Sequence, residues 1–217
     1  MPQFLLEKPR ARFALERFIE IARDTGQNGV CIDIGCGPGH HLMFIKEKGP
    51  FREVHGLDVG GRGPAAADRY FATRLEDFES EQTYDGIWCS HTLEHTANPG
   101  IFLRKLRSIA SDNALICITV PPLRHDNTVG HLTMWNAGTL LLNLVKAGFD
   151  CSRARIRRRG YNISVVLQNN LRAAGADPPT PNAATDVRGR MPVGLEWHRS
   201  LRGVSYFNGN IKRMNWT

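Results

Sequence analysis

The sequence predicts an α/β fold built on a mostly parallel sheet that helices cover on both faces. Apolar residues alternate between helical and strand-like spacing along the chain, as they do in βαβ units. No internal repeat or low-complexity tract interrupts this alternation, and a glycine-rich turn directly follows the first predicted strand. A chain of 217 residues, of which 41% are hydrophobic, is long enough to bury one such core.

The predicted elements follow one another in βαβ order, and each crossover should be right-handed. Residues 10–24 place Phe13, Phe18 and Ile21 at helical spacing with charges between them, which predicts an amphipathic helix. The strands expected after it are Val30–Ile34, Glu53–Val59, Tyr70–Thr73, Gly86–Ser90 and Ala114–Val120. The helices expected between and after these strands are His41–Lys48, a segment around Phe102–Ile109, and Asn136–Ala147.

Two final strands complete a predicted sheet of seven. They cover about Cys151–Arg157 and Tyr161–Gln168, and the short Arg/Gly turn between them predicts an antiparallel hairpin. We therefore assign residues 1–168 to the domain and residues 169–217 to a C-terminal extension. Disordered tails are poor in aromatic residues, so we expect this extension to pack on the domain or at a subunit interface. Its aromatic residues include Trp197, Tyr206, Phe207 and Trp216.

Composition excludes several classes of protein. No apolar run approaches the roughly 20 residues that span a bilayer, so we expect no membrane partner. The first 18 residues carry charges throughout and lack the apolar core of a secretory signal, which favours a cytoplasmic location. The five cysteines are widely spaced and four lie in predicted strands, which indicates neither disulfides nor a zinc site. They are Cys31, Cys36, Cys89, Cys117 and Cys151.

A glycine-rich motif occupies the turn between the first strand and the next helix. It contains Asp33, Gly35, Gly37 and Gly39, and Asp58 follows nineteen residues later at the end of the second strand. Glycine lets the backbone turn sharply and lets a ligand lie directly against the main chain. A carboxylate at the second strand end can accept hydrogen bonds from both hydroxyls of a ribose. The spacing predicts a nucleotide-type cofactor at the carboxyl end of the sheet.

These residues resemble the first two motifs of class I S-adenosylmethionine-dependent methyltransferases. The resemblance continues through Glu76–Phe78, Tyr84–His95 and Leu115–Pro122, and it covers about residues 28–168. The Leu93–His95 element, followed by a basic helix and a strand ending in Val-Pro, is similar to the ubiquinone-pathway type of small-molecule methyltransferase. The resemblance implies a Rossmann-like, doubly wound fold that binds S-adenosylmethionine and releases S-adenosylhomocysteine.

The resemblance also implies roles for individual residues. Asp33 would orient the methionine end of the cofactor, Asp58 would hold the ribose hydroxyls, and Asp77 would accept from the adenine amino group. Phe78 would pack beside adenine, and Ser90 would lie under the cofactor at the end of the fourth strand. The remaining cofactor-binding positions are the glycines, which would line the methionine and ribose: Gly35, Gly37 and Gly39.

Two alternatives apply to the cofactor site. Acidic residues are dense after Glu76, so Asp77 is nearly as well interpreted as part of a solvated turn. A dinucleotide-binding enzyme also uses a glycine-rich turn, but its pattern requires Gly or Ala at position 40, where His40 stands. The methyltransferase interpretation also accounts for Asp58 and the Leu93–His95 element.

Three histidines are candidates for a general base. His91, Glu94 and His95 would share one face of a helix at their i, i+3, i+4 spacing. The similar ubiquinone-pathway enzymes carry a carboxylate where His91 stands, and in some of them this cluster is thought to hold a divalent metal. Imidazole suits a softer metal than Mg²⁺, so we assign no metal site and keep a divalent metal as an alternative. His131, in the loop after the fifth strand, is the preferred base, with Trp135 as an acceptor-side wall or as core.

The basic residues are concentrated in the last third of the chain. Residues 151–217 carry 12 Lys/Arg against 3 Asp/Glu. Arg153, Arg155 and Arg157 alternate along a predicted edge strand, where charge prevents edge-to-edge aggregation or attracts an anionic acceptor. RNA is the less favoured partner, because no recognised RNA-binding module and no interleaved aromatic residues accompany these arginines.

Three functions are therefore compared. The leading hypothesis is methyl transfer to a hydroxyl of a small-molecule or glycan acceptor, by an enzyme that could form a homodimer. The second is an RNA-modifying methyltransferase that uses the basic C-terminal third. The third is a non-catalytic cofactor-binding protein, since fold alone does not determine activity.

Overall fold

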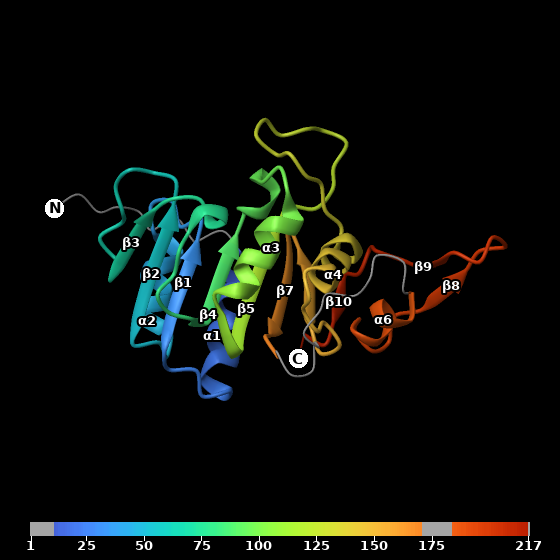
Figure 1. Cartoon of the computed structure of the whole chain (residues 1–217), viewed down its shortest axis with the longest axis horizontal. Helices are drawn as coiled ribbons and strands as arrows, with labels where there is room; N and C mark the ends of the chain where they lie inside the picture. The colour runs from blue at the N-terminus through green and yellow to red at the C-terminus, as the bar shows by residue number, and fades with distance from the viewer. Residues whose placement is uncertain (1–10, 171–183, 217) are drawn as a thin grey trace.

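The computed structural model describes residues 11–170 and 184–216, and its main feature is one mixed sheet (Figure 1). The parallel strands are β1 (Val30–Ile34), β2 (Glu53–Asp58), β3 (Arg69–Ala72), β4 (Tyr84–Ser90) and β5 (Ala110–Val120). The antiparallel strands are β6 (Arg155–Arg159), β7 (Asn162–Gln168) and β10 (Arg213–Met214). The strand order is β10-β6-β7-β5-β4-β1-β2-β3. The predicted mostly parallel sheet with a C-terminal antiparallel hairpin is confirmed.

The predicted number of seven strands is wrong, because the sheet has eight. The additional strand is β10, in which Arg213 pairs with Arg157 and Met214 with Ile156. Two residues are too few to show strand periodicity, so only the folded chain reveals this pairing. The prediction that the arginine-rich strand forms the sheet edge is wrong for the same reason, since β10 covers β6.

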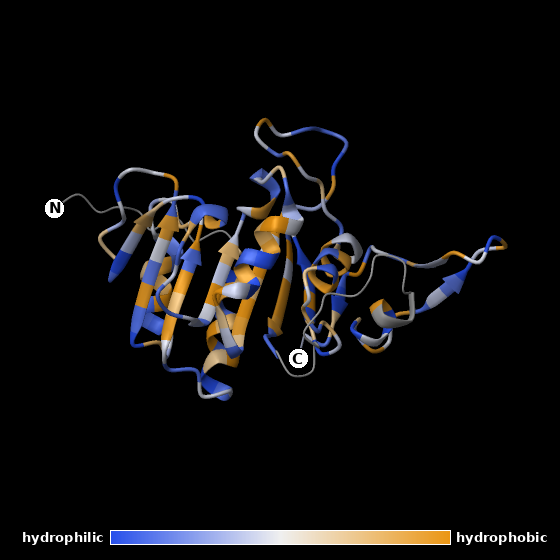
Figure 2. Ribbon diagram, viewed as in Figure 1, coloured by the Kyte–Doolittle hydropathy of each residue, from blue (hydrophilic) through white to orange (hydrophobic). Residues whose placement is uncertain are grey.

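Helices cover both faces of the sheet. On one face lie α1 (Arg12–Asp24) and α2 (His40–Lys48), and on the other lie α3 (Pro99–Ser108) and α4 (Ala137–Lys146). Side chains of β5 alternate between the two layers: Cys117 packs on the α1 side and Ile116 on the α3 side. Figure 2 shows hydrophobic residues concentrated in the central strands. This alternation explains why β5 is buried on both faces.

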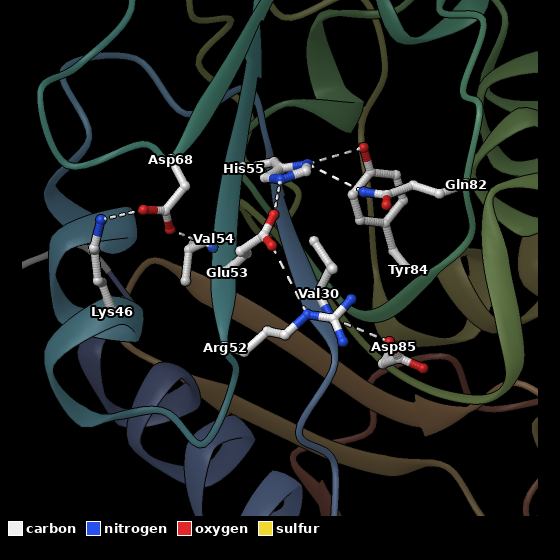
Figure 3. Close-up of polar contacts among 10 residues, drawn as sticks. All are labelled: Val30, Lys46, Arg52, Glu53, Val54, His55, Asp68, Gln82, Tyr84 and Asp85. Carbon is white, nitrogen blue, oxygen red and sulfur yellow. Dashed lines mark hydrogen bonds and ion pairs between the residues drawn. The ribbon is translucent and has the colours of Figure 1, made fainter.

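A polar network supports the β2 side of the sheet, where Figure 3 shows His55 between Glu53 and Tyr84. The His55 ring is fully buried, with Nε2 3.1 Å from Glu53 Oε2 and Nδ1 3.3 Å from the Tyr84 hydroxyl. At the amino end of β1, Val30 N donates to Asp85 Oδ2 at 3.1 Å. These contacts satisfy buried polar groups, so we interpret the network as structural.

The described part of the C-terminal segment packs on the sheet. It comprises α6 (Ala184–Gly189), the hairpin of β8 (Trp197–Arg199) and β9 (Ser205–Phe207), and β10. Ile211 belongs to the core on the α3 side, and Trp216 belongs to the core on the α1 side. Trp216 stacks on Phe13 with 5.7 Å between ring centroids. The segment therefore contributes to both hydrophobic layers.

None of the helices within residues 11–170 and 184–216 is long and apolar enough to cross a membrane.

Candidate active site

The glycine-rich turn lies at the carboxyl end of β1, immediately before α2. Gly35 and Gly37 adopt φ values of 73° and 49°, a left-handed conformation that glycine adopts without steric cost. A Cβ on Gly35 would lie 2.0 Å from Thr92 Oγ1, so this position must be glycine to pack against the segment after β4. A Cβ on Gly37 would meet no atom within 4 Å. The backbone at Gly37 is therefore open to an approaching ligand.

Asp58 lies beside this turn because β1 and β2 pair in parallel. Ile34 is in register with Leu57, and Gly35 N donates to Leu57 O at 2.7 Å. The Asp58 carboxylate accepts from Gly37 N at 2.8 Å through Oδ2 and from Gly60 N at 3.1 Å through Oδ1. The structure thus brings together the acid and the glycine turn that the spacing predicted.

A cavity of about 390 Å³ opens at this edge of the sheet. Its walls come from the ends of β1, β2, β3 and β4 and from the two 3-10 turns, η1 (Leu75–Asp77) and η2 (Leu93–His95). Parallel sheets bind ligands at this position, beyond the carboxyl ends of the strands. The lining residues that bear on function are Gly35, Asp58, Arg74, Glu76, His91, Thr92 and His95.

Six of the eight predicted cofactor-binding residues lie outside the lining of this cavity: Asp33, Gly37, Gly39, Asp77, Phe78 and Ser90. Asp77 is exposed and is not among its lining residues, whereas its neighbour Glu76 is half-buried and lines it. Glu76 Oε1 accepts from Thr96 Oγ1 at 2.9 Å, which fixes the carboxylate toward the cavity. Phe78 is buried in the core, where its ring lies 4.7 Å from that of Phe71. The side-chain directions in η1 therefore place Glu76, and not Asp77, at the cavity.

Asp33 and Ser90 are buried next to the cavity-lining ends of β1 and β4. Asp33 is 1% exposed, and neither of its carboxylate oxygens has a hydrogen-bond partner within the described residues. Burial, and secondarily the charge of Asp58, raises the pKa of Asp33 to about 8. Ser90 Oγ also lacks a partner there. Buried polar atoms rarely remain unsatisfied, so these atoms fit a site that receives polar groups of a ligand.

Two of the three predicted histidines line the cavity. His91, which follows β4 with a φ of 56°, places Nδ1 3.1 Å from Glu94 Oε1 and Nε2 2.8 Å from Asn162 Oδ1. His95 Nδ1 lies 2.8 Å from Gly130 O, in the loop that rises above the carboxyl end of the sheet (Figure 1). His131 lies outside the cavity lining and packs edge-on against His95, with 5.1 Å between ring centroids.

The side chains that could hold a metal differ from those expected. Leu93–His95 forms a 3-10 turn rather than an α-helix, so His95 faces the loop after β5 while His91 faces Glu94. Glu94, His95 and His131 each offer a ligand atom, and these atoms lie within 4.8 Å of one another. Glu94 is fully buried, and its Oε2 has no hydrogen-bond partner in the described part of the chain. Three such donors suit an imidazole-preferring divalent metal.

Trp135 is a core residue rather than an exposed acceptor wall. It is 3% exposed, and its Nε1 donates to Thr133 Oγ1 at 3.0 Å. The acceptor side of the cavity is bounded instead by His91 and His95.

The sequence interpretation missed three cavity residues. Arg74, Glu76 and Thr92 line the cavity, yet none lies in a pattern that separates it from its neighbours. The contact between Thr92 and the glycine turn links segments that are distant in sequence. Only the packing of β4 beside β1 makes that contact predictable.

Comparison with known proteins identifies a family. Residues 6–153, more than half of the chain, match the family model described as "Methyltransferase domain". (S)-tetrahydroprotoberberine N-methyltransferase of Eschscholzia californica is 29% identical over 99 residues. That match covers 40% of this chain and 28% of the relative, so the chain spans well under two thirds of the relative's length.

Solved structures share the fold. N-methyltransferase NodS from Bradyrhizobium japonicum WM9 superposes with a TM-score of 0.61 at 14% identity, over 77% of this chain and 100% of that chain. The 1,6-didemethyltoxoflavin-N1-methyltransferase of Burkholderia thailandensis, with bound 1,6-didemethyltoxoflavin and S-adenosylhomocysteine, gives a TM-score of 0.58 at 17% identity. That match covers 73% of this chain and 79% of that chain.

Proposed function

The chain belongs to the class I S-adenosylmethionine-dependent methyltransferases, and we propose that it methylates a nitrogen atom of a small-molecule acceptor. The relatives named above are N-methyltransferases, and one of them holds a small-molecule substrate beside S-adenosylhomocysteine. The observation that supports the proposal most directly is the cavity at the carboxyl edge, whose lining includes Gly35, Asp58 and two histidines.

The cofactor half of the proposal assigns roles to residues that line or border this cavity. Asp58 receives the ribose hydroxyls, and the open backbone at Gly37 permits close approach of the cofactor. Glu76 replaces Asp77 as the acid near the adenine amino group, because Glu76 is the one that faces the cavity. The unpartnered Asp33 carboxyl serves the methionine end. S-adenosylmethionine supplies an electrophilic methyl group on its sulfonium.

The acceptor half assigns the histidines to proton removal and positioning. An ammonium group must lose a proton before its nitrogen can attack a methyl group, and we assign that proton to His95, which lines the cavity. Both ring nitrogens of His91 already face acceptor oxygens, so we assign His91 a positioning role. The buried Glu94 carboxylate lies 3.1 Å from Nδ1 of His91 and holds that ring in place. His131 contacts His95 rather than the cavity, so we assign it a positioning role.

Hydroxyl methylation is the second candidate. The same histidines would serve a hydroxyl acceptor, which needs a base more than an amine does. The proposed closeness to ubiquinone-pathway enzymes, supported by Leu93–His95, favours this candidate.

A transfer assay with methyl-labelled S-adenosylmethionine distinguishes the two candidates. Acceptors are offered as matched pairs on one skeleton, such as a cyclic secondary amine and the corresponding alcohol, or glucosamine and glucose. We expect label on the amine member of a pair, located by NMR of the product. Label on hydroxyl members alone would overturn the nitrogen assignment. The His91→Ala variant should lose transfer while retaining S-adenosylhomocysteine binding.

A further inference from the structure

A row of polar side chains crosses the sheet on the face covered by α1. Ser90 is in register with Thr119, Thr119 with Ser164, and Ser164 with Arg157. Residues in register on neighbouring strands point to the same face, so these four side chains form one row. Two residues closer to the amino end of β4, the equivalent row packs Trp88, Cys117 and Val166 under α1 before it reaches Arg155. A buried polar group lowers stability unless it is hydrogen-bonded, so each side chain of this row should have a hydrogen-bond partner.

Only part of this row is satisfied internally. Thr119 Oγ1 donates to Ser164 Oγ at 3.0 Å. Ser90 Oγ and Arg157 Nε are both buried and have no hydrogen-bond partner among the described residues. Since unsatisfied donors inside a fold are rare, the two ends of the row indicate groups that a ligand completes.

The arginine end of the row opens into a cavity of about 360 Å³ between the first turn of α1 and the β6–β7 hairpin. Asn162 and Ser164 contribute from β7, and Phe13 contributes from α1. The charged walls are Arg12, Glu16, Arg157 and Arg159. This cavity therefore has a polar floor and a basic rim.

No described residue neutralises the charges of Arg157 and Arg159. In residues 11–170 and 184–216, no carboxylate lies within ion-pair distance of either guanidinium. Both guanidiniums lie over the Phe13 ring, 5.9 Å and 4.6 Å from its centroid. Stacking on an aromatic ring orients the planar fork of arginine without using its donors. The one acid in the cavity, Glu16, is paired with Arg12 at 2.7 Å.

Protection of a sheet edge does not account for Arg157, because β10 pairs with β6 at that residue. Arg158 points to the opposite face, and its Nη1 donates to Asn210 Oδ1 at 2.7 Å. The two guanidiniums repel each other, and an anion that binds between them would replace this repulsion with attraction.

Asn162 connects this basic cavity to the cofactor cavity. It lines the basic cavity, and its Oδ1 lies 2.8 Å from Nε2 of His91, which lines the cofactor cavity. The two cavities therefore adjoin each other at the contact between His91 and Asn162.

We propose that the methyl acceptor carries an oxyanion, a carboxylate or a phosphate, that binds Arg157 and Arg159 in the cavity between α1 and β6. This inference rests on the proposed function, since it names the chemical class of the acceptor. Arginine matches both oxyanions with paired N–H donors, and Arg157 Nε supplies a donor that nothing in the described chain uses. Asn162 and Ser164 contribute neutral hydrogen bonds to the same group.

The test measures the binding of small anions to the full chain by calorimetry. The protein is first saturated with S-adenosylhomocysteine, so that the carboxylate of that molecule does not contribute to the measured heat. Phenyl phosphate and benzoate are the anionic probes, and benzyl alcohol is the neutral control. We expect both anions, and not benzyl alcohol, to bind the wild-type protein. Arg159→Gln should weaken anion binding about tenfold or more, because each charge-assisted hydrogen bond contributes that much. Whichever anion binds more tightly identifies the oxyanion class.

Arg158→Gln is the matched control, since it removes the same charge from the next position on the opposite face of β6. It should leave anion affinity unchanged. Arg157→Gln is the second variant and should behave as Arg159→Gln does. Equal anion affinity in wild-type, Arg157→Gln and Arg159→Gln proteins would overturn the inference, as would no anion binding by the wild-type protein. Failure of the wild-type protein to bind S-adenosylhomocysteine would instead overturn the proposed function.

Discussion

Replacing Asp33 by Asn removes a buried carboxyl group whose pKa the fold raises from 3.8 to about 8. A raised pKa means that the folded protein binds the proton more tightly than the unfolded chain does. The protonated Asp33 carboxyl therefore makes its full contribution to the free energy of unfolding below pH 3.8, and this contribution is lost as pH rises toward 8. The loss is about 1.4 kcal/mol per pH unit, or roughly 3 kcal/mol between pH 5 and pH 7.

The measurement is urea unfolding of wild-type and Asp33→Asn proteins at pH 5, 6 and 7. Asn cannot ionise, so the free energy of unfolding of the Asp33→Asn protein, relative to wild type, should increase by about 3 kcal/mol from pH 5 to pH 7. Asp68→Asn is the control: the pKa of Asp68 is lowered, chiefly by its hydrogen bond with Lys46, so its difference from wild type should stay constant. A constant difference for Asp33→Asn as well would refute the reasoning.

Three further predictions concern the glycine turn, the histidines and the C-terminal segment. Gly37→Ala should weaken S-adenosylhomocysteine binding at least about tenfold in calorimetry. Gly26→Ala is the control and should not weaken binding, because Gly26 has a similar positive φ and equally open surroundings but does not line the cavity. His95→Ala should lower turnover by about 10²-fold or more, and His131→Ala should lower it by less. A chelator should leave the turnover of the wild-type protein unchanged. If a chelator removes turnover and added divalent metal restores it, that result would instead establish a metal site at Glu94, His95 and His131. Trp216→Ala should destabilise the protein by about 3 kcal/mol in urea unfolding, because the buried ring stacks on Phe13, and unaltered stability would contradict its place in the core.

Local patterns predicted the part of the site that lies in one stretch of chain. The glycine turn follows a strand and precedes a helix, and Asp58 ends the next strand. Parallel pairing then places them together, as Ile34 opposite Leu57 shows. Such an arrangement follows from sequence order alone, because successive strands of a βαβ unit end at the same edge.

Features that depend on side-chain direction could not be predicted in this way. Glu76 and Asp77 are adjacent acids, and only the 3-10 geometry of η1 turns Glu76 toward the cavity. The helical spacing assumed for His91, Glu94 and His95 does not apply in the 3-10 turn η2. The pairing of His95 with His131 brings together residues from two loops, which sequence spacing does not encode.

The C-terminal part of the sheet was the least predictable. The hairpin of β6 and β7 follows from its alternating apolar residues and its Arg/Gly turn. The strand β10 has only two residues, and its pairing with β6 depends on the chain returning from the β8–β9 hairpin. That return covers β6 at Ile156 and Arg157, whereas the cavity beside these arginines is formed by α1 and the β6–β7 hairpin.

Binding of S-adenosylhomocysteine to wild-type and Asp58→Ala proteins tests the central claim most directly. The Asp58 carboxylate lies at the glycine turn and lines the cofactor cavity, so its removal should weaken binding roughly 10- to 100-fold, the contribution of hydrogen bonds to a charged group. Asp68→Ala, which removes a carboxylate outside that cavity, should bind as the wild-type protein does. Equal affinity of the Asp58→Ala and wild-type proteins, with both folded, would contradict the assignment of this cavity to the cofactor.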